Sequence, residues 1–320
     1  MRNVGYVAID DGPRRTLAAL QSHLPGPWLD AKRCDWGGSL RAQDIELLIC
    51  GTSDSEQGRE AEAGARRAAH ALGVPAVVIE DFPGNFAAMS TPPRLLCVES
   101  EFAAALARRQ MSALAVHVGP AIRYDALRRA STALRREEHS ADAVLWIGQP
   151  ETSDALRTLE ELLPALQARG ARLWFRAHPR DAGYAAGEYA RFLGRAGEIE
   201  DVTRLPLEEC LKRRPGLAIT QFSSLAIEAG FWGIPALNVL FTDVGGRTLA
   251  ARKGYAVPPW CEAGAAFLIL RAQEMDKVLD RALGSAEARR GVMDAFDEYF
   301  SVGTEGAPAL INLLYNQGLL

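Results

Sequence analysis

The sequence predicts an α/β fold made of two doubly wound, Rossmann-like domains that face each other across a cleft. Short apolar runs typical of buried parallel strands alternate with helical stretches along the chain. The alternation restarts after a charged segment at 137–142, which divides the chain into domains 1–138 and 139–320. A length of 320 residues suits two domains, and 48% hydrophobic with 24% charged residues is the composition of a packed protein.

The first domain is expected to contain five strands that alternate with helices. Asp10 and Asp11 follow the first strand and precede Gly12 and Pro13. Because ligands bind at the carboxyl ends of strands in open parallel sheets, both aspartates are candidate catalytic groups, with helix capping as the alternative. Asp81, in a loop after the third strand, is the next candidate. The expected strands are 4–9, 46–50, 74–80, 94–98 and 113–118, and the helices are 14–23, 56–72, 101–109 and 121–138.

The second domain repeats the pattern of strand and helix. Its organising stretch is 173–239, which supplies the second, fourth and fifth strands, with a weak strand at 199–202 between them. A flexible loop is expected at 244–246, and the closing helices are expected to return to the first domain. The remaining expected strands and helices are 143–147, 153–168, 225–232 and 267–283.

Polar residues at the strand ends of the second domain predict a nucleotide-binding site. His178 ends a strand and can donate to a phosphate or protonate a leaving group near neutral pH. Ser223 and Ser224 open the helix at 225–232, where hydroxyls and free amides can hold a phosphate or simply cap the helix. Glu228 lies one turn further on and can accept from ribose hydroxyls. The predicted nucleotide-binding residues are Gln149, Arg176, His178, Arg180, Ser223, Ser224 and Glu228.

Several other functions are disfavoured by the sequence. A formal net charge of −4 argues against nucleic-acid binding, which needs clustered positive charge. The five cysteines lack metal-ligand spacing, and no His-Glu-x-x-His helix is present, so no metal site is expected. A phosphate loop and a dinucleotide fingerprint are also absent, and no cofactor is expected. No apolar run approaches the length of a membrane span, which favours a cytoplasmic protein.

These motifs resemble the carboxyl-terminal domain of glycosyltransferase-B-fold enzymes of bacterial surface-glycan synthesis. The resemblance rests on the His-Pro at His178, the serine pair at Ser223 and Ser224, and Glu228 on the following helix. It covers about 143–240 at the level of motifs. The enzymes it resembles include capsule-polysaccharide transferases, glycerophosphotransferases and bacterial sialyltransferases, and the nucleotide-sugar 2-epimerases share the fold.

The resemblance implies a metal-independent glycosyltransferase that uses a nucleotide-sugar donor, CMP- or UDP-linked, and a glycan or other hydroxyl acceptor. His178 would stabilise the departing phosphate. The Asp-Asp-Gly at Asp10, Asp11 and Gly12 resembles the motif that supplies the base in bacterial sialyltransferases, with Asp11 preferred over Asp10. The alternatives are a nucleotide-sugar 2-epimerase or hydrolase, or a non-catalytic member of the fold that binds a nucleotide sugar.

Overall fold

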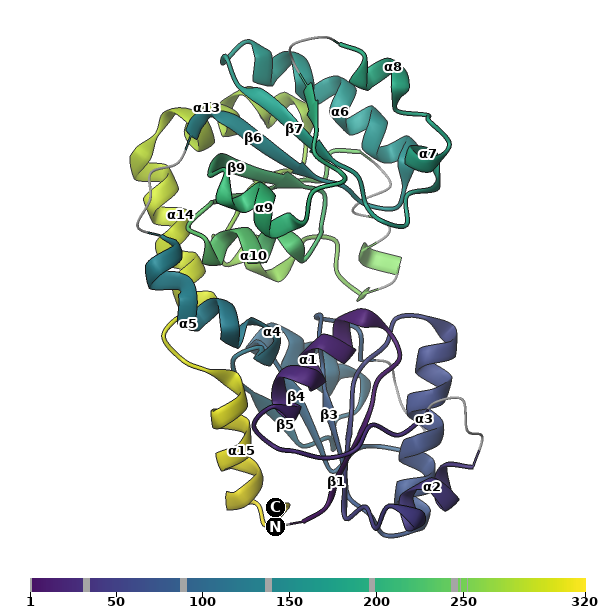
Figure 1. Ribbon diagram of the computed structural model, residues 1–320. Coiled ribbons are helices and arrows are strands. Elements are labelled where there is room, and N and C mark those ends of the chain that lie inside the picture. The colour runs from purple at the N-terminus through teal and green to yellow at the C-terminus, as the bar shows by residue number, and fades with distance from the viewer. Residues whose placement is uncertain are drawn as a thin grey trace. The chain divides into compact units, whose positions relative to one another are not determined.

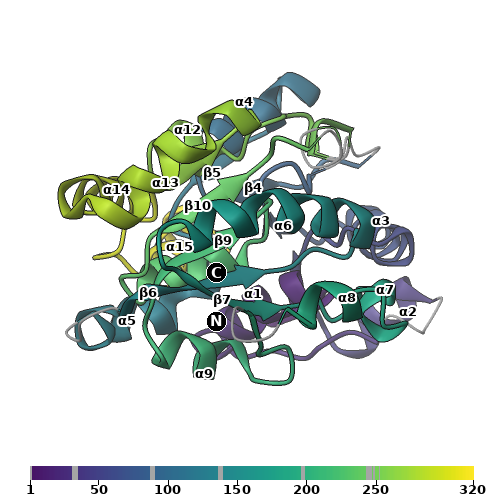
Figure 2. The same cartoon turned by 90° about the horizontal axis from the view of Figure 1, so that it is seen from above.

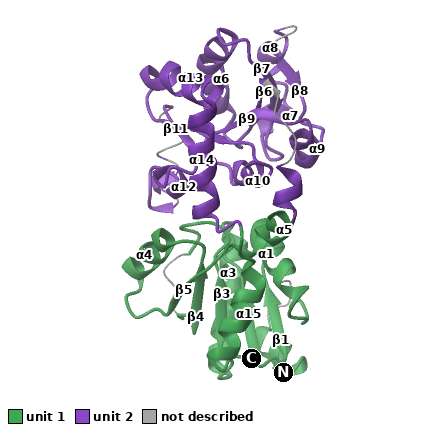
Figure 3. Ribbon diagram, turned by 90° about the vertical axis from the view of Figure 1, so that its left-hand side faces the viewer, with its two compact units in different colours: residues 1–129, 303–320 green, residues 130–302 purple. Residues whose placement is uncertain are grey.

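The computed structural model describes residues 2–30, 35–86, 91–135, 140–195, 199–242, 247, 249–251 and 253–320. The chain forms two compact units (Figure 3). Unit 1 contains residues 1–129 and 303–320, and unit 2 contains residues 130–302. The chain therefore leaves unit 1, builds unit 2 and returns to unit 1 with its last segment.

Unit 1 is built on a parallel sheet with the order β1-β2-β3-β4-β5. Beyond β1, Trp28 forms an isolated parallel bridge with Tyr6, so a short extended segment flanks β1 on its other side. The chain thus goes first to one side of β1 and then to the other, which places a topological switch point between β1 and β2. The strands are β1 (Val4–Val7), β2 (Leu47–Cys50), β3 (Ala76–Ile79), β4 (Leu95–Val98) and β5 (Val116–Val118).

Helices cover both faces of the unit 1 sheet (Figure 1). One face packs against α1 (Asp11–Gln21) and α15 (Gly306–Asn316), the other against α2 (Trp36–Ala42), α3 (Glu56–Ala71) and α4 (Glu101–Gln110). Asp125 attaches α15 to this unit, because its carboxylate accepts from the backbone N–H groups of Gly306 and Ala307 at 2.7 and 2.8 Å. It lies after the 3-10 turn η1 (Ile122–Tyr124), at the start of α5 (Asp125–Leu134).

Unit 2 is built on a parallel sheet with the order β11-β10-β9-β6-β7-β8. The chain adds β7 and β8 on one side of β6 and then β9, β10 and β11 on the other, which is the strand order of dinucleotide-binding folds. The switch point therefore lies between β6 and β9. The strands are β6 (Ser140–Ile147), β7 (Arg172–Arg176), β8 (Ile199–Asp201), β9 (Pro215–Thr220), β10 (Ala236–Val239) and β11 (Phe267–Ile269).

The main core of unit 2 lies between this sheet and the helices α6 (Thr152–Gln167) and α13 (Met275–Gly284). The helices α6 and α9 (Leu207–Lys212) lie on opposite sides of β7 (Figure 2). On α10 (Leu225–Phe231), Phe231 packs edge-on against Phe296 of α14 (Ala286–Tyr299), with ring centroids 5.2 Å apart. Smaller elements complete the unit: α7 (Ala182–Ala185), α8 (Ala190–Leu193), α12 (Pro259–Glu262) and the turn η2 (Ala272–Glu274).

The predicted fold class is confirmed: both units are α/β with parallel sheets. The expected helix at 267–283 is wrong in its first part, because Phe267–Ile269 forms β11 along β10 and α13 begins only at Met275. The expected linker at 137–142 is wrong over its last residues, since β6 already begins at Ser140, while 137–139 lie outside the described residues. The expected loop at 244–246 also lies outside them.

The closing segment was assigned to the second domain by the division at 138/139, yet it was expected to return to the first. In the structure α15 belongs to unit 1, where Ala307, Leu310 and Leu314 are buried in the core beside α1. Burial of this apolar stripe holds the segment on unit 1. Among the described residues, no helix is both long enough and apolar enough to cross a membrane.

Candidate functional site

The carboxyl-terminal edge of the unit 2 sheet collects most of the predicted site residues. Because β9, β6 and β7 are neighbours, the loops that follow them lie side by side. Gly148 allows this close approach: a Cβ there would lie 2.9 Å from the backbone nitrogen of His178 and 3.0 Å from the carbonyl oxygen of Arg176. Its own N–H donates to the Arg176 carbonyl at 2.8 Å. Only glycine at this position allows the loops after β6 and β7 to lie this close together.

His178 follows β7 and has a defined hydrogen-bonding state. Its Nδ1 accepts from the backbone N–H of Arg180 at 3.0 Å, so in the neutral ring the proton lies on Nε2. Burial lowers the pKa of His178, and the charges of Arg180 and Arg176 lower it further, against an opposing effect of Asp181. The imidazole is therefore neutral at pH 7 and presents Nε2–H as a donor.

Asp181 holds the loop that carries His178. Its carboxylate accepts from Thr152 Oγ1 at 2.5 Å, from the Tyr184 N–H at 3.1 Å and from the Tyr189 hydroxyl at 2.7 Å. Its backbone N–H donates to the His178 carbonyl at 2.9 Å. With these bonds Asp181 caps α7 and ties the loop to α6, so the position of His178 is set by α6 as well as by β7.

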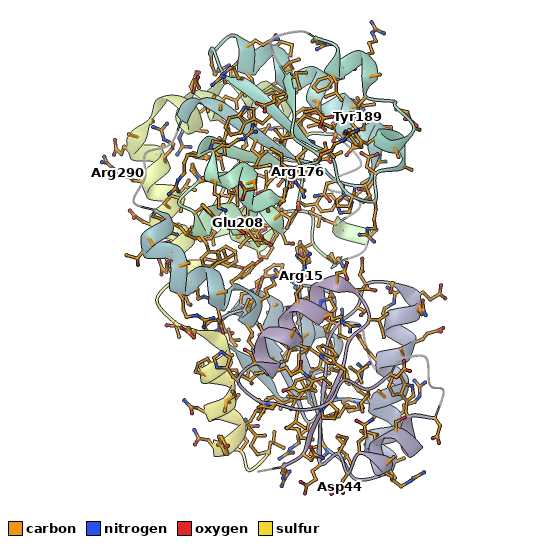
Figure 4. The ribbon with its side chains drawn as sticks, in the orientation of Figure 1. Arg15, Asp44, Arg176, Tyr189, Glu208 and Arg290 are labelled. Atoms are coloured by element: carbon orange, nitrogen blue, oxygen red, sulfur yellow. The ribbon has the colours of Figure 1, made fainter. Side chains whose placement is uncertain are left out.

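Arg176 and Arg180 add positive charge to this edge. Arg176 is the last residue of β7 (Figure 4), and its Nε is buried without a hydrogen-bond partner among the described residues. An unpartnered buried donor on a guanidinium is costly unless water or an anion satisfies it. Arg180 is exposed. Both charges lie on residues that flank His178 in sequence, where they favour an anion.

The two serines that follow β9 differ in their hydrogen bonds. Ser223 Oγ accepts from the Leu225 N–H at 3.3 Å, and the Ser223 N–H donates to Thr220 Oγ1 at the same distance. Ser224 is the N-cap residue of α10, but its side chain makes no capping hydrogen bond. The capping alternative therefore applies to Ser223 in part and not to Ser224. Glu228 is half-buried in the first turn of α10.

A buried polar network lies beneath this edge and includes Gln149. Gln149 Nε2 lies 3.5 Å from Thr220 Oγ1, which donates to the Ile147 carbonyl at 2.7 Å. The side-chain amide of Gln221 donates to Asp154, and the backbone carbonyl of Gln221 accepts from Asn238 Nδ2 at 2.9 Å. These bonds fix the loop before Ser223. Gln221 was not among the predicted residues, although its position directly after a strand was the signal that could have identified it.

In unit 1, Asp10 is held in the structure by hydrogen bonds. Its carboxylate accepts from the N–H groups of Asp54 and Ser55, both at 2.8 Å, and from Ser55 Oγ at 2.5 Å. Ser53 Oγ accepts from the Asp10 N–H at 3.1 Å and donates to Glu62 at 2.6 Å. Asp10 thus joins the loops after β1 and β2 across the switch point. It does not cap its own helix.

Asp11 and Asp81 differ in exposure. Asp11 is the first residue of α1 and is exposed, whereas Asp81 is buried and accepts from Thr52 Oγ1 and Asn85 Nδ2, both at 2.9 Å. A Cβ on Gly12 would lie 2.5 Å from Asp81 Oδ2. The glycine of the Asp-Asp-Gly motif therefore lets α1 begin against the Asp81 carboxylate. Of the three aspartates, only Asp11 has an exposed side chain.

Two glutamates that the sequence did not single out lie beside a small pocket in unit 1. Glu80 follows β3 and Glu99 follows β4; both line a cavity of about 20 Å³ together with His117. Glu80 Oε2 and both carboxyl oxygens of Glu99 are buried without a hydrogen-bond partner among the described residues. Arg123 approaches Glu99 only to 3.9 Å. A cavity of this size is room for about one water molecule.

Burial raises the pKa of Glu80 to about 8, and the carboxylates of Glu99 and Asp81 add to this effect. Burial likewise raises the pKa of Glu99, against the charge of Arg123. Both groups therefore hold a proton at a pH where ordinary carboxyls have lost it. Paired acids of this kind are typical of sites that exchange protons with a substrate. Among the described residues, no group of acidic, histidine and cysteine side chains has the geometry of a metal site.

No protein-family model matches the chain, and no curated protein is detectably similar to it in sequence. Solved structures share its fold. A putative UDP-N-acetylglucosamine 2-epimerase from Listeria monocytogenes is 13% identical with a TM-score of 0.71, over 100% of this chain and 98% of that one. UDP-GlcNAc 2-epimerase from Neisseria meningitidis bound to UDP-GlcNAc is 10% identical with a TM-score of 0.65, over 99% and 100% of the two chains.

The rhamnosyltransferase SpnG is 14% identical with a TM-score of 0.59, over 99% of this chain and 100% of that one. Epimerases and glycosyltransferases therefore both align with the whole chain. At these identities the likeness concerns the fold, and it confirms an architecture of the glycosyltransferase-B type.

Proposed function

We propose that the protein is a nucleotide-sugar enzyme that holds the nucleotide phosphates at the carboxyl-terminal edge of unit 2. The observation that carries this proposal is the state of His178, whose Nδ1 is occupied by the Arg180 N–H so that Nε2–H is left as a donor. Arg176, whose Nε has no hydrogen-bond partner among the described residues, ends β7, and Ser224, whose hydroxyl makes no capping bond, follows β9; both strands pair with β6. Ligands bind at this edge of doubly wound sheets.

In this proposal the unit 2 residues bind and stabilise the phosphate. Neutral His178 donates one hydrogen bond, and Arg176 and Arg180 supply charge that offsets the negative charge of a departing nucleotide. Ser224 supplies a hydroxyl donor, and Glu228 accepts from ribose hydroxyls. Because the donors are an imidazole, guanidinium groups and a hydroxyl, nucleotide binding needs no metal ion. The nucleotide is a UDP or CMP derivative, as the resemblance to surface-glycan enzymes implies.

For the reaction, isomerisation of the sugar is the first candidate. Glu80 and Glu99 are buried carboxyl groups with raised pKa values beside a cavity the size of a water molecule, and carboxyl groups with raised pKa values can act as acids or bases near neutral pH. The carboxylate of Asp10, by contrast, accepts three hydrogen bonds from the loop after β2 and is a poor candidate for a base. Several structures that share the fold are of 2-epimerases.

Glycosyl transfer is the second candidate. Exposed Asp11 at the start of α1 favours it, because a base for an acceptor hydroxyl must be accessible. The fold likeness to the rhamnosyltransferase SpnG is consistent with it. In that case the acceptor is a glycan or another hydroxyl compound, and Asp11 takes up its proton.

The two candidates separate in deuterated water. With UDP-GlcNAc as the probe and no acceptor, an isomerase that removes a proton from carbon introduces solvent deuterium into the sugar ring, visible as loss of a proton signal by NMR. A transferase leaves the ring protons in place until an acceptor is added. Glu80→Gln should abolish the exchange while UDP binding persists. If neither exchange nor transfer occurs with any UDP- or CMP-sugar, the proposal of an enzyme is overturned.

A further inference from the structure

A second and larger pocket lies at the opposite edge of the unit 1 sheet, at the amino ends of β3, β4 and β5. Its volume is about 490 Å³, and it is lined by the residues before these strands and by the last turns of α3. Volumes of roughly 300–1,000 Å³ are usual for small-molecule sites. Asp10, Glu80 and Glu99 all follow the carboxyl ends of their strands, so this pocket is distinct from the groups assigned above.

The ionisable side chains that line this pocket are Arg66, His70 and Arg94, and no aspartate or glutamate is among the lining residues. Within the described part of the chain, none of the three forms an ion pair. The whole chain carries a formal net charge of −4, so a pocket lined by basic side chains and no acidic ones differs from the chain as a whole. Positive charge in a concave, partly enclosed place attracts an anion more strongly than the same charge on an open surface.

Arg66 gives this pocket a buried charge. It is only 5% exposed, and its Nε has no hydrogen-bond partner among the described residues. Its charge lowers the pKa of the Cys50 thiol and of the Glu62 carboxyl, against the larger, opposite effect of burial. Burial raises the pKa of Glu62 to about 7, so at neutral pH that carboxyl supplies only part of a counter-charge. A guanidinium stays protonated, and a buried one without a full counter-ion is stabilised when an anion approaches.

The rest of the lining is mostly apolar. The carbonyl oxygens of Pro75, Ala76 and Ala115 already accept hydrogen bonds from the backbone of neighbouring strands, so they offer a ligand little. Thr91 supplies one hydroxyl. Pro93 and Leu114 are buried and form part of the wall. A ligand that matches this lining has a negatively charged group for the arginines and a small apolar body for the walls.

We propose that this pocket binds a small organic anion, a phosphate or a carboxylate attached to an apolar group, at a site separate from the nucleotide. Arg66 contributes charge from beneath, while Arg94 and His70 contact the anion at the exposed mouth. The proposal does not depend on the proposed function, since it rests on unit 1 residues that take no part in it.

The test uses the histidine side chains as reporters in NMR. The chain has five histidines, and His70→Gln assigns the signal of His70. Titration with phenyl phosphate and, separately, with benzoate should move the His70 ring signals in a saturable way, because a bound anion lies beside the imidazole. The probe that binds with the higher affinity shows whether the pocket prefers a phosphate or a carboxylate. Phenol, which lacks the charge, should cause no saturable change in the His70 signals.

Variants at the mouth of the pocket decide the outcome. Arg94→Gln should lower the affinity for the tighter-binding probe about three- to tenfold. Arg94→Glu should abolish saturable binding, because the reversed charge repels the anion. Arg94 is exposed, so the fold tolerates both changes. Arg41→Gln, an exposed arginine on α2 outside the pocket, is the matched control and should bind normally. Unchanged affinity in Arg94→Glu, or no saturable response of His70 to either probe, overturns the proposal.

Discussion

The backbone N–H of Arg180 donates to Nδ1 of His178 at 3.0 Å and thereby selects the tautomer of the imidazole. A histidine with this bond presents Nε2–H as its remaining polar group. His178 lies two residues after β7, which pairs with β6, one of the two strands at the switch point of this doubly wound sheet. A fixed donor at this edge is preorganised for a ligand oxygen, because no rearrangement of the ring is needed on binding.

Gly148→Ala should disturb this arrangement without changing any predicted ligand contact. The new Cβ would lie 2.9 Å from the backbone nitrogen of His178 and 3.0 Å from the carbonyl oxygen of Arg176. Backbone atoms cannot rotate away as a flexible side chain can. We expect a loss of about 1–3 kcal/mol in the free energy of unfolding, typical of overpacking, and weaker UDP binding. Urea denaturation and calorimetry measure the two effects.

Gly291→Ala is the control for that change. Gly291 lies within α14, and a Cβ there would meet no atom within 4 Å. Alanine in a helix interior should stabilise the protein by about 1 kcal/mol and leave UDP binding as it was. If Gly148→Ala behaves like Gly291→Ala, the close approach of the loops after β6 and β7 has no energetic importance.

Asp10→Asn and Asp11→Asn should separate a structural aspartate from an accessible one. Asp10 accepts from two N–H groups and the Ser55 hydroxyl, so its replacement should cost about 1–3 kcal/mol in unfolding free energy. Asp11 is exposed, and its replacement should change stability by less than about 0.5 kcal/mol. Chemical denaturation of both variants measures the difference, and equal stabilities would contradict the assigned role of Asp10.

Turnover by the same two variants tests the transferase alternative. If Asp11 is a general base, Asp11→Asn should slow transfer about 10²–10⁴-fold with nearly unchanged donor affinity. The assay is donor consumption in the presence of an acceptor that the native protein uses. Full activity in Asp11→Asn would remove Asp11 from that role.

Glu80 should make stability depend on pH. Its pKa is about 8 in the folded protein and about 4.5 in the unfolded chain, so between these values the folded state binds the extra proton. The contribution of Glu80 to stability is therefore fully present below pH 4.5 and is lost as the pH rises towards 8. The slope is about 1.4 kcal/mol per pH unit for one proton.

Glu80→Gln should remove this part of the slope, because glutamine keeps an oxygen for the N–H groups of Gly84 and Phe86 but cannot ionise. The measurement is urea denaturation at several pH values between 5 and 8. Burial also raises the pKa of Glu62 and Glu99, so some slope of the same sign should persist in the variant. An identical slope in both proteins would mean that Glu80 titrates normally.

The fold could largely be predicted from the sequence, because the apolar runs that form the strands are short, buried and separated by helical stretches. β11 was missed since Phe267–Ile269 is only three residues long and directly precedes a helix, so the two patterns merge. The return of α15 was expected, but its anchor, the carboxylate of Asp125, lies 181 residues from Gly306 and leaves no local signal.

The site could be predicted in part. The chain topology brings Gln149, His178 and the serine pair to one edge, as the alternation of strands and helices indicated. The role of each residue was harder to predict from the sequence. Asp10 is joined to Ser55 across 45 residues, and the raised pKa of Glu80 arises from burial beside Glu99. Such effects come from tertiary packing, which single-residue patterns do not encode.

Binding of UDP to unit 2 tests the central claim most directly. Titration calorimetry in the presence of a chelator should show UDP binding to the native protein. His178→Ala should weaken it about ten- to a hundredfold, which corresponds to the loss of one hydrogen bond to a charged group, with unfolding unchanged. His178→Gln should retain part of the affinity, because its side-chain amide is still a donor, and His23→Ala, an exposed histidine of unit 1, should bind normally. If His178→Ala binds UDP as tightly as the native protein, or if UDP binds only with added metal, the assignment of this edge as the nucleotide site is contradicted.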